Sequence, residues 1–506
     1  MSSVVTTGSG RVEGLVEDGL HVFRGIPYAE PPVGDLRFRA PQPIKPWSGV
    51  REARSYGPYC PQLPDPVQGR IWALSGESSE DCLTLNVWTP GMDSARRPVM
   101  VWIHGGAFVV GAARRPVTEG AELARRGDVV VVTLNYRLGV LGWLNLENHG
   151  GEEFARSGNH GLLDQVAALA WVRGNIEQFG GDPENVTVFG ESAGGISVSV
   201  LLSCELGRGL FDKAIAQSGA PNLVRSRSQS RELAARFVEI AGAKDAYDLQ
   251  RVGPENLLGA QERLFQEVGF DVSFGPVMDG TDVPETPLGA LDEGTGESIP
   301  LLAGTNLDEF RYWHLEDPSY ATLRPEHLRN RLDAEVPAGA DAVIETYKAS
   351  RPHLTENELA LALISDIAFR MGHVRMAEAR ARRGAPTWMY LITWRTPVME
   401  GKLGSPHAVD LPFVFGNLDV PNVHELIGDA PERRELATAM QDAWIAFARD
   451  GDPSHRLLPD WPVYDLEQRA TMRFDLPCEL LRDPFPEERS VWKGVPFDGL
   501  RPSLAG

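Results

Sequence analysis

The stretch Gly190-Glu191-Ser192-Ala193-Gly194 has the pattern G-x-S-x-G. It follows the apolar segment 185–189 and precedes residues 195–198, which can open a helix. A strand that turns sharply into a helix at such a serine exposes the hydroxyl above a sheet, and glycines two residues before and after leave room for the turn. The spacing therefore predicts a nucleophilic serine, Ser192, suited to acyl transfer.

A second candidate is the loop His104-Gly105-Gly106-Ala107, directly after an apolar strand candidate at 99–103. Acyl transfer passes through a tetrahedral intermediate with a negatively charged oxygen, and backbone N–H groups aimed at that oxygen stabilise it. Small residues let the backbone approach closely. The loop predicts such donors, although an ordinary glycine turn would look the same.

A serine nucleophile needs a histidine base and an acid that orients the histidine, in the chain order serine, acid, histidine. His104 precedes the serine and is interpreted as structural. His407 lies in a loop after a strand candidate, and Glu309 lies just past another, where catalytic groups of such sheets gather. Asp308 competes with Glu309, and the residues alone do not decide between them.

Elements that could position these groups alternate along the chain. Apolar runs typical of strands covered on both faces lie at 84–88, 99–103, 129–134, 186–189, 214–217, 300–304 and 388–393, with helical periodicity at 162–179 and 433–448. Strands alternating with helices predict an α/β fold with a large, mostly parallel, twisted sheet and helices on both faces. Without repeats or clear linkers, residues 1–506 are expected to form one domain with long insertions.

Composition excludes several classes of partner. The net charge of −21 argues against nucleic acid. The sequence shows neither a leader nor an apolar run long enough to span a bilayer, so we expect no membrane partner and a cytoplasmic location, or export if a leader has been removed. The four cysteines lack zinc spacing. Since nucleophile, base and donors all come from the chain, we expect no cofactor and no metal.

Several motifs in the same order resemble the type-B carboxylesterase and cholinesterase family, over about residues 10–496. They are the glycine loop at 104–107, Glu80-Asp81-Cys82-Leu83-Thr84-Leu85-Asn86-Val87, the stretch 159–165, the phrase 189–195 around Ser192, and residues 407–416 starting at His407. Within this family, the sequence most resembles the bacterial para-nitrobenzyl-esterase-like carboxylesterases. The resemblance implies the α/β-hydrolase fold.

The resemblance also implies roles. Ser192 is acylated, His407 transfers protons, and Glu309 orients His407; the choice of Glu309 over Asp308 comes from the family alone. The N–H groups of Gly106, Ala107 and Ala193 form the oxyanion hole, with Ala107 in place of a glycine found in many members.

Further implications of the resemblance are structural. Glu191 corresponds to a carboxylate that supports the catalytic residues. Arg37 with Glu80 and Arg137 with Asp164 correspond to ion pairs, and Cys60 with Cys82 to a disulfide, which a reducing compartment would leave open.

The leading hypothesis is a serine carboxylesterase acting on short- to medium-chain or aryl esters, with a small-molecule ester as its partner. Phe270, Val272 and Phe274 are candidates for the acyl pocket, or plain core residues. A choline-binding role for Trp72 is weakly supported. A hydrolase of a specific carbamate, lactone or polyester would use the same chemistry, and a non-catalytic binding protein is the alternative of a different class. Neither natural substrate nor oligomeric state follows from the sequence.

Overall fold

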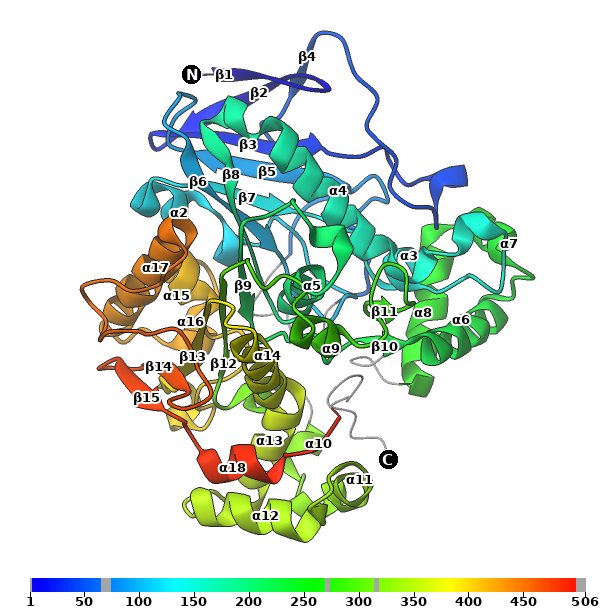
Figure 1. Cartoon of the computed structure of the whole chain (residues 1–506). Helices are drawn as coiled ribbons and strands as arrows, with labels where there is room; N and C mark the ends of the chain where they lie inside the picture. The colour runs from blue at the N-terminus through cyan, green and yellow to red at the C-terminus, as the bar shows by residue number, and fades with distance from the viewer. Residues whose placement is uncertain (1, 65–73, 269–273, 314–317, 497–506) are drawn as a thin grey trace.

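The computed structural model describes residues 2–64, 74–268, 274–313 and 318–496. Within these ranges, a 13-stranded sheet runs through the molecule (Figure 1) in the order β1-β2-β3-β5-β7-β6-β8-β9-β12-β13-β14-β15, and β4 pairs with β2. Its strands are β1 (Ser2–Thr7), β2 (Gly10–Glu17), β3 (Leu20–Pro27), β4 (Val50–Glu52), β5 (Thr84–Thr89), β6 (Arg97–Ile103), β7 (Val130–Leu134), β8 (Gly181–Glu191), β9 (Lys213–Gln217), β12 (Leu301–Asn306), β13 (Thr387–Ile392), β14 (Ala470–Phe474) and β15 (Glu479–Arg482).

The sheet has a parallel centre and antiparallel ends. Each adjacent pair from β7 through β6, β8, β9, β12 and β13 to β14 is parallel, whereas β1-β2-β3-β5-β7 and β14-β15 pair antiparallel. The predicted strands lie in this sheet within a few residues of their expected bounds.

Helices cover both faces because the central strands are apolar on both sides. In β6, Val99 and Val101 face one core with the helices α4 (His160–Asn175) and α5 (Ala193–Leu202). Met100 and Trp102 face the other core, with α2 (Ala121–Gly127), α15 (Leu411–Phe415) and α17 (Arg433–Asp450). The predicted helix 162–179 is divided, since α4 is followed by a 3-10 turn at Ile176–Phe179.

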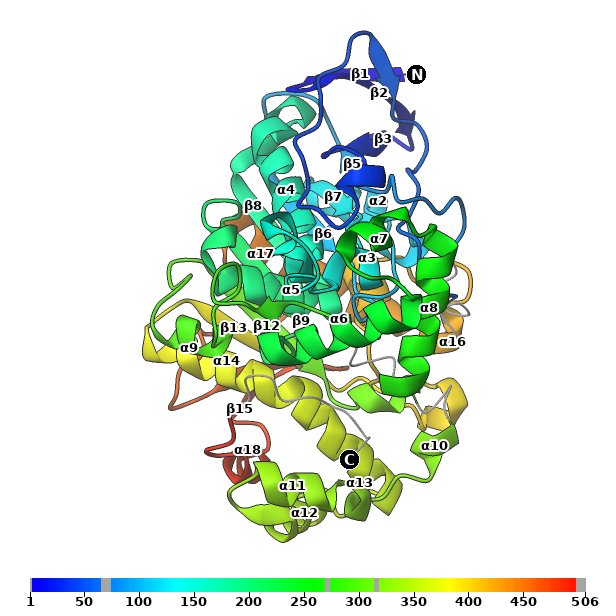
Figure 2. The same cartoon turned by 90° about the vertical axis from the view of Figure 1, so that its right-hand side faces the viewer.

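A third core lies in helices away from the sheet, seen at the bottom of Figures 1 and 2. It includes α10 (Pro318–Ala321), α11 (Arg329–Glu335), α12 (Gly339–Ser350), α13 (Glu356–Ser365), the π-helix η10 (Asp366–Arg370) and α14 (Met371–Arg382). The C-terminal helix α18 (Pro486–Val491) packs against α12. These helices contribute one wall of the site described below.

The helices α3 (Gly139–Trp143), α6 (Arg227–Ala241), α7 (Ala246–Arg251) and α8 (Pro254–Val268) lie on the side of the short parallel pair β10 (Arg225–Ser226) and β11 (Val277–Met278) (Figure 1). In this region α6 packs against α8. The helix α9 (Pro287–Asp292) packs against α14, and α16 (His424–Ile427) contributes to the core that contains α15 and α17.

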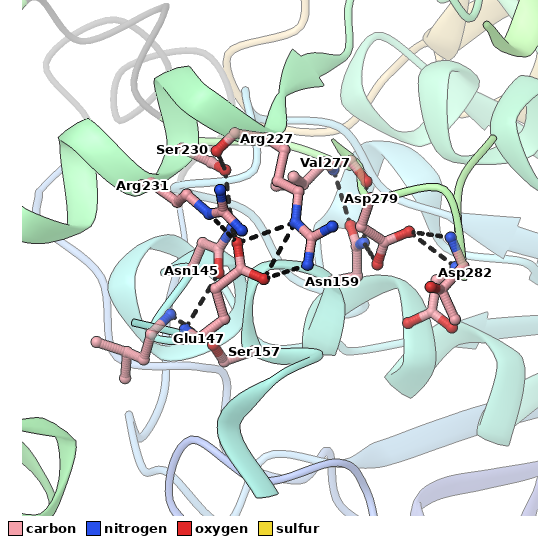
Figure 3. Close-up of polar contacts among 12 residues, drawn as sticks. Asn145, Glu147, Ser157, Asn159, Arg227, Ser230, Arg231, Val277, Asp279 and Asp282 are labelled. Carbon is pink, nitrogen blue, oxygen red and sulfur yellow. Dashed lines mark hydrogen bonds and ion pairs between the residues drawn. The ribbon is translucent and has the colours of Figure 1, made fainter. Parts of the chain in front are cut away.

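A polar cluster fastens α6 and β11 to the segment between α3 and α4 (Figure 3). We call it the α6 clamp; it consists of Asn145, Glu147, Ser157 and Asn159 on the core side and Arg227, Ser230, Arg231, Val277 and Asp279 on the other. Glu147 accepts hydrogen bonds from Arg227 (2.6 Å) and Arg231 (2.5 Å). Asn159 pairs with the backbone of Val277 through its amide oxygen (2.8 Å) and nitrogen (3.0 Å). Every charge in this cluster has a partner of opposite sign or a hydrogen bond.

Candidate active site

Ser192 occupies the sharp turn that its flanking glycines predict. Strand β8 ends at Glu191 and α5 begins at Ala193, and Ser192 between them has φ 56° and ψ −123°, which side-chain-bearing residues rarely adopt. A Cβ on Gly190 would lie 2.5 Å from the Gly194 backbone, and one on Gly194 would lie 2.0 Å from the Ile103 carbonyl oxygen. The glycine spacing is therefore a steric requirement of this turn.

The glycine loop lies directly against this turn, because Ile103 at the end of β6 pairs with Gly190 in β8. Gly106 (φ 117°) and Ala107 (φ 52°) both have positive φ, and a Cβ on Gly106 would lie 2.1 Å from the Val110 carbonyl oxygen. Among the described residues, none accepts a hydrogen bond from the backbone N–H of Gly106, Ala107 or Ala193. These three donors remain free for a bound group.

His104 at the start of the loop is structural, as interpreted from the sequence. Its ring is buried and stacks on Tyr136 with centroids 4.4 Å apart. Burial lowers the pKa of His104 to about 3, so the imidazole is neutral at physiological pH.

His407 and Glu309 come together from the ends of neighbouring parallel strands. Glu309 follows β12, His407 lies beyond β13, and the His407 Nδ1 atom is 2.6 Å from Glu309 Oε2. The other carboxylate oxygen, Oε1, accepts hydrogen bonds from Ser218 Oγ (2.6 Å) and the Asn306 N–H (2.8 Å). Because Glu309 is fully buried, these bonds hold its carboxylate in a single orientation toward the imidazole.

Asp308, the competing acid, faces a different set of groups. Its carboxylate accepts a hydrogen bond from the Ser405 N–H (3.0 Å) and forms an ion pair with Arg311 (3.0 Å). It thereby fastens the loop that carries His407 without contacting the imidazole. The geometry favours Glu309 as the orienting acid.

Two more carboxyl groups lie near the imidazole. Glu191 Oε1 is 3.1 Å from His407 Nε2, and Asp410 accepts a hydrogen bond from Gln217 Nε2 (2.6 Å). Burial raises the pKa of Glu191 to about 8 and that of Asp410 to about 6. Burial also opposes the charged imidazole, but Glu191 and Glu309 outweigh it and raise the pKa of His407 to about 9.

The side chains of Ser192 and His407 are not hydrogen-bonded to each other in this structure. No hydrogen bond joins Ser192 Oγ to His407 within the described ranges, and Nε2 faces Glu191 instead. A cavity of about 20 Å³, large enough for one water molecule, adjoins Gly106, Glu191 and His407. The structure thus brings the turn at Ser192, the glycine loop and the pair of His407 and Glu309 to one place, with Nε2 3.1 Å from Glu191.

Aromatic side chains that the sequence did not single out line the other side of the imidazole. The ring centroids of Phe369 and Trp313 lie 4.9 Å and 5.0 Å from that of His407. Phe369 belongs to the π-helix η10, and Trp313 follows the 3-10 turn that starts at Glu309. No local sequence signal marks Phe369; Trp313, four residues after Glu309, could have been suspected from proximity in sequence.

Of the predicted acyl-pocket residues, Phe270 and Val272 lie outside the described residues. Trp72, which was considered for choline binding, also lies outside them. Phe274 is 5 % exposed and packs against Phe265, with centroids 6.0 Å apart. The adjacent Gly275 lies close to Phe108, which directly follows the glycine loop, since a Cβ on Gly275 would be 3.3 Å from the Phe108 ring. Phe274 therefore lies in the core close to the donor loop, and its role in a substrate pocket stays a prediction.

The structural pairs implied by the resemblance lie together. Arg37 is 2.5 Å from Glu80, and Arg137 is 2.7 Å from Asp164. Cys60 and Cys82 are both buried, and both thiols are free in this structure. The Cys60 thiol and burial both raise the pKa of the Cys82 thiol. The disulfide stays a prediction.

Comparison with known proteins identifies the family of the chain. Residues 1–492 match the Carboxylesterase family. The chain is 41 % identical over 496 residues to para-nitrobenzyl esterase of Bacillus subtilis (strain 168), covering 96 % of this chain and 97 % of that protein. It is 36 % identical to phenmedipham hydrolase of Pseudarthrobacter oxydans, covering 95 % and 97 %. The solved Geobacillus stearothermophilus carboxylesterase EST55 superposes with a TM-score of 0.88 at 41 % identity, covering 97 % of this chain and all of that one.

The fold and the nucleophile turn define an α/β-hydrolase, as predicted. The chain belongs to the carboxylesterase family and is a serine carboxylic ester hydrolase. Within the described residues, no helix is both long and apolar enough to cross a bilayer.

Proposed function

We propose that this enzyme hydrolyses short- to medium-chain or aryl carboxylic esters through Ser192, His407 and Glu309. The observation that carries the proposal is the 2.6 Å contact between His407 Nδ1 and Glu309, placed beside a serine held at a strained turn. A buried carboxylate on Nδ1 fixes the imidazole tautomer that leaves Nε2 free to accept a proton.

In the first half of the reaction, Ser192 Oγ attacks the ester carbonyl while His407 Nε2 takes its proton. The negative charge on the tetrahedral oxygen is stabilised by the N–H groups of Gly106, Ala107 and Ala193, which have no acceptor among the described residues. His407 then gives the proton to the leaving alcohol, and an acyl-enzyme remains on Ser192.

In the second half, water attacks the acyl-enzyme with His407 as base, and the carboxylic acid leaves as Ser192 regains its proton. The imidazole becomes positively charged in both halves. Glu191, 3.1 Å from Nε2, and Glu309 both favour that charged state. In the open arrangement seen here, Nε2 has to turn from Glu191 toward Ser192 before it can accept the proton.

The experiment is a panel of p-nitrophenyl esters with acyl chains of increasing length, combined with an organophosphate that labels the nucleophile. We expect the highest kcat/KM for short to medium chains and one covalent adduct, mapped to Ser192. An adduct on another residue would contradict the mechanism. A hydrolase dedicated to a carbamate, lactone or polyester would use the same residues, so the panel includes one of each. Phenmedipham is added because one relative carries its name; a kcat/KM for any of these far above that of every simple ester would contradict the substrate class.

A further inference from the structure

The small cavity beside His407 has an arginine in its wall. Arg115, which follows the glycine loop, lines this cavity of about 20 Å³ together with Glu191 and His407. Among the described residues that line the cavity, Arg115 is the one lysine or arginine. A guanidinium stays charged throughout the pH range in which proteins are folded. A permanent cation therefore lies at the same small space as the proposed catalytic base.

The backbone around Arg115 is fixed on both sides. Before it, the carbonyl oxygen of Ala113 accepts a hydrogen bond of 2.8 Å from Thr133 Oγ1. After it comes the 3-10 turn η2 (Pro116–Thr118), in which one carbonyl oxygen accepts a hydrogen bond of 3.0 Å from Asn417 Nδ2. A proline confines the preceding residue to extended conformations, and Arg115 has φ −68° and ψ 131°. A change of the Arg115 side chain should therefore leave the backbone of this segment in place.

The charge of Arg115 acts inside the protein. The residue is 8 % exposed, and the cavity has room for about one water molecule, so little solvent screens the charges around it. Burial raises the pKa of Glu191, and the Arg115 guanidinium opposes that rise. Burial lowers the pKa of His104, and Arg115 lowers it further. The remaining titratable side chain in the cavity wall is the phenol of Tyr312.

The charges around His407 come from four segments of the chain. Glu191 ends β8, Glu309 follows β12, and Asp410 lies on the loop of the histidine itself. Burial disfavours the charged imidazole, whereas these three carboxyl groups favour it. Arg115 has the same sign of charge as the imidazolium and therefore disfavours it. It offsets part of the negative charge that the carboxyl groups bring to the site.

This offset matters because the base has to be neutral before it can accept a proton. The carboxyl groups raise the pKa of His407 to about 9. At neutral pH, only about one imidazole in a hundred would then be neutral, and each further unit of pKa would reduce that fraction tenfold. A fixed cation in the cavity wall limits this loss.

We propose that Arg115 is a positioning residue that acts through the charge of His407: its buried cation offsets one of the three carboxyl groups and lets the imidazole release its proton at a lower pH. This inference rests on the proposed function, because it takes His407 as the base.

The test is the pH dependence of kcat/KM on phenyl acetate, measured for Arg115→Gln, Glu191→Gln and the two changes together. Arg115→Gln should move the midpoint up by about 0.5–1 pH unit, because the carboxyl groups are no longer offset. Well below the midpoint, kcat/KM should fall about three- to tenfold, with the plateau at high pH unchanged. Glu191→Gln removes a charge of the opposite sign, so the double variant should have a midpoint close to that of the wild type.

Two further variants separate charge from structure. Arg115→Lys keeps the cation and should keep the midpoint of the wild type. Arg114→Gln is the matched control, since it removes the same charge from the neighbouring residue. The Arg114 guanidinium lies over the ring of Tyr56, with 5.2 Å to its centroid, and Arg114 does not line the cavity. Its removal should leave the midpoint in place.

An unchanged or lowered midpoint in Arg115→Gln would overturn the inference, and so would an Arg115→Lys midpoint that moves as far as that of Arg115→Gln. If Arg115→Gln does not fold, Arg115→Met, which fills the space without a polar group, is measured in its place. Organophosphate labelling of Ser192 is followed in every variant. Absence of labelling in the wild type would refute the proposed function, whereas normal labelling with an unmoved midpoint refutes only the role of Arg115.

Discussion

The active site and the α6 clamp differ in how their carboxyl groups are paired with cationic groups. Around His407, three carboxyl groups, Glu191, Glu309 and Asp410, face one imidazole, and two of their pKa values are raised. In the clamp, the carboxylate of Glu147 faces two arginines, Arg227 and Arg231. Burial disfavours its charge, but hydrogen bonds from Arg227 and Arg231 outweigh this and lower its pKa to about 2.

The difference indicates where function lies. An excess of buried charge of one sign costs stability and persists where catalysis uses it, whereas balanced charge holds elements together. The active site also contains strained backbone, since Ser192 and Ala107 both have positive φ. The predictions below separate the two regions by changing one at a time.

The largest effect is expected from Ser192→Ala, which removes the proposed nucleophile. The rate should fall by a factor of about 10⁴ or more, because removing one member of such a triad costs about that much. The melting temperature should stay close to that of the wild type, since the hydroxyl makes no hydrogen bond within the described part of the chain. Activity within tenfold of the wild type on p-nitrophenyl acetate would exclude Ser192 as nucleophile.

The next effect distinguishes two adjacent acids. Glu309→Gln removes the anion on His407 Nδ1 and should lower kcat by about three to four orders of magnitude. Asp308→Asn should lower it less than about tenfold, because Asp308 contacts Ser405 and Arg311 and does not contact the imidazole. The two variants are compared on one aryl ester at equal folded fraction. If Asp308→Asn were the inactive enzyme, the third member of the triad would be wrong.

Changing the α6 clamp should lower stability and leave activity unchanged. Glu147→Gln leaves Arg227 and Arg231 without their carboxylate and should lower the free energy of unfolding by about 1–3 kcal/mol, with kcat/KM unchanged. The folded pKa of Glu147 lies below its unfolded value, so its stabilisation is complete above the unfolded pKa and is lost as pH falls toward about 2. Urea unfolding at several pH values should therefore show the two proteins converging in acid. A stability difference that grows in acid would contradict this.

The smallest effect is a shift in the pH profile. His407 has to be neutral to accept a proton, so kcat/KM should rise with pH through its apparent pKa. Glu191→Gln removes the carboxylate nearest to Nε2 and should move the midpoint down by about 1 pH unit, because an opposite charge no longer favours the imidazolium. Glu147→Gln should leave the midpoint in place. An unchanged midpoint in Glu191→Gln would show that Glu191 does not act on His407, and a midpoint that moves up would contradict the sign of the expected effect.

The features that could be predicted from the sequence are those determined by a few neighbouring residues. The glycines around Ser192 are dictated by a turn that excludes a Cβ, and the central strands are continuous apolar runs, so both leave a signal in a few consecutive residues. The choice between Glu309 and Asp308 could not be made from the residues, because adjacent carboxylates at the end of a strand differ only in what they face.

Other features depend on packing between distant segments. Phe369 reaches His407 from a π-helical turn whose next residue, Arg370, contacts Glu488, more than a hundred residues further along the chain. Asp410 lies in the motif that begins with His407, but its burial beside Gln217 follows only from the fold. Such contacts carry no pattern that a single sequence displays.

The positions of the proposed catalytic groups in the sequence affect how activity returns after denaturation. Glu309 and His407 are 98 residues apart and meet only when β12 and β13 have paired, while Ser192 needs β6 and β8. Parallel strands joined by long connections are among the slowest contacts of a protein to form. Regained esterase activity therefore reports completion of the whole central sheet, and in refolding experiments it should lag behind the recovery of helical signal.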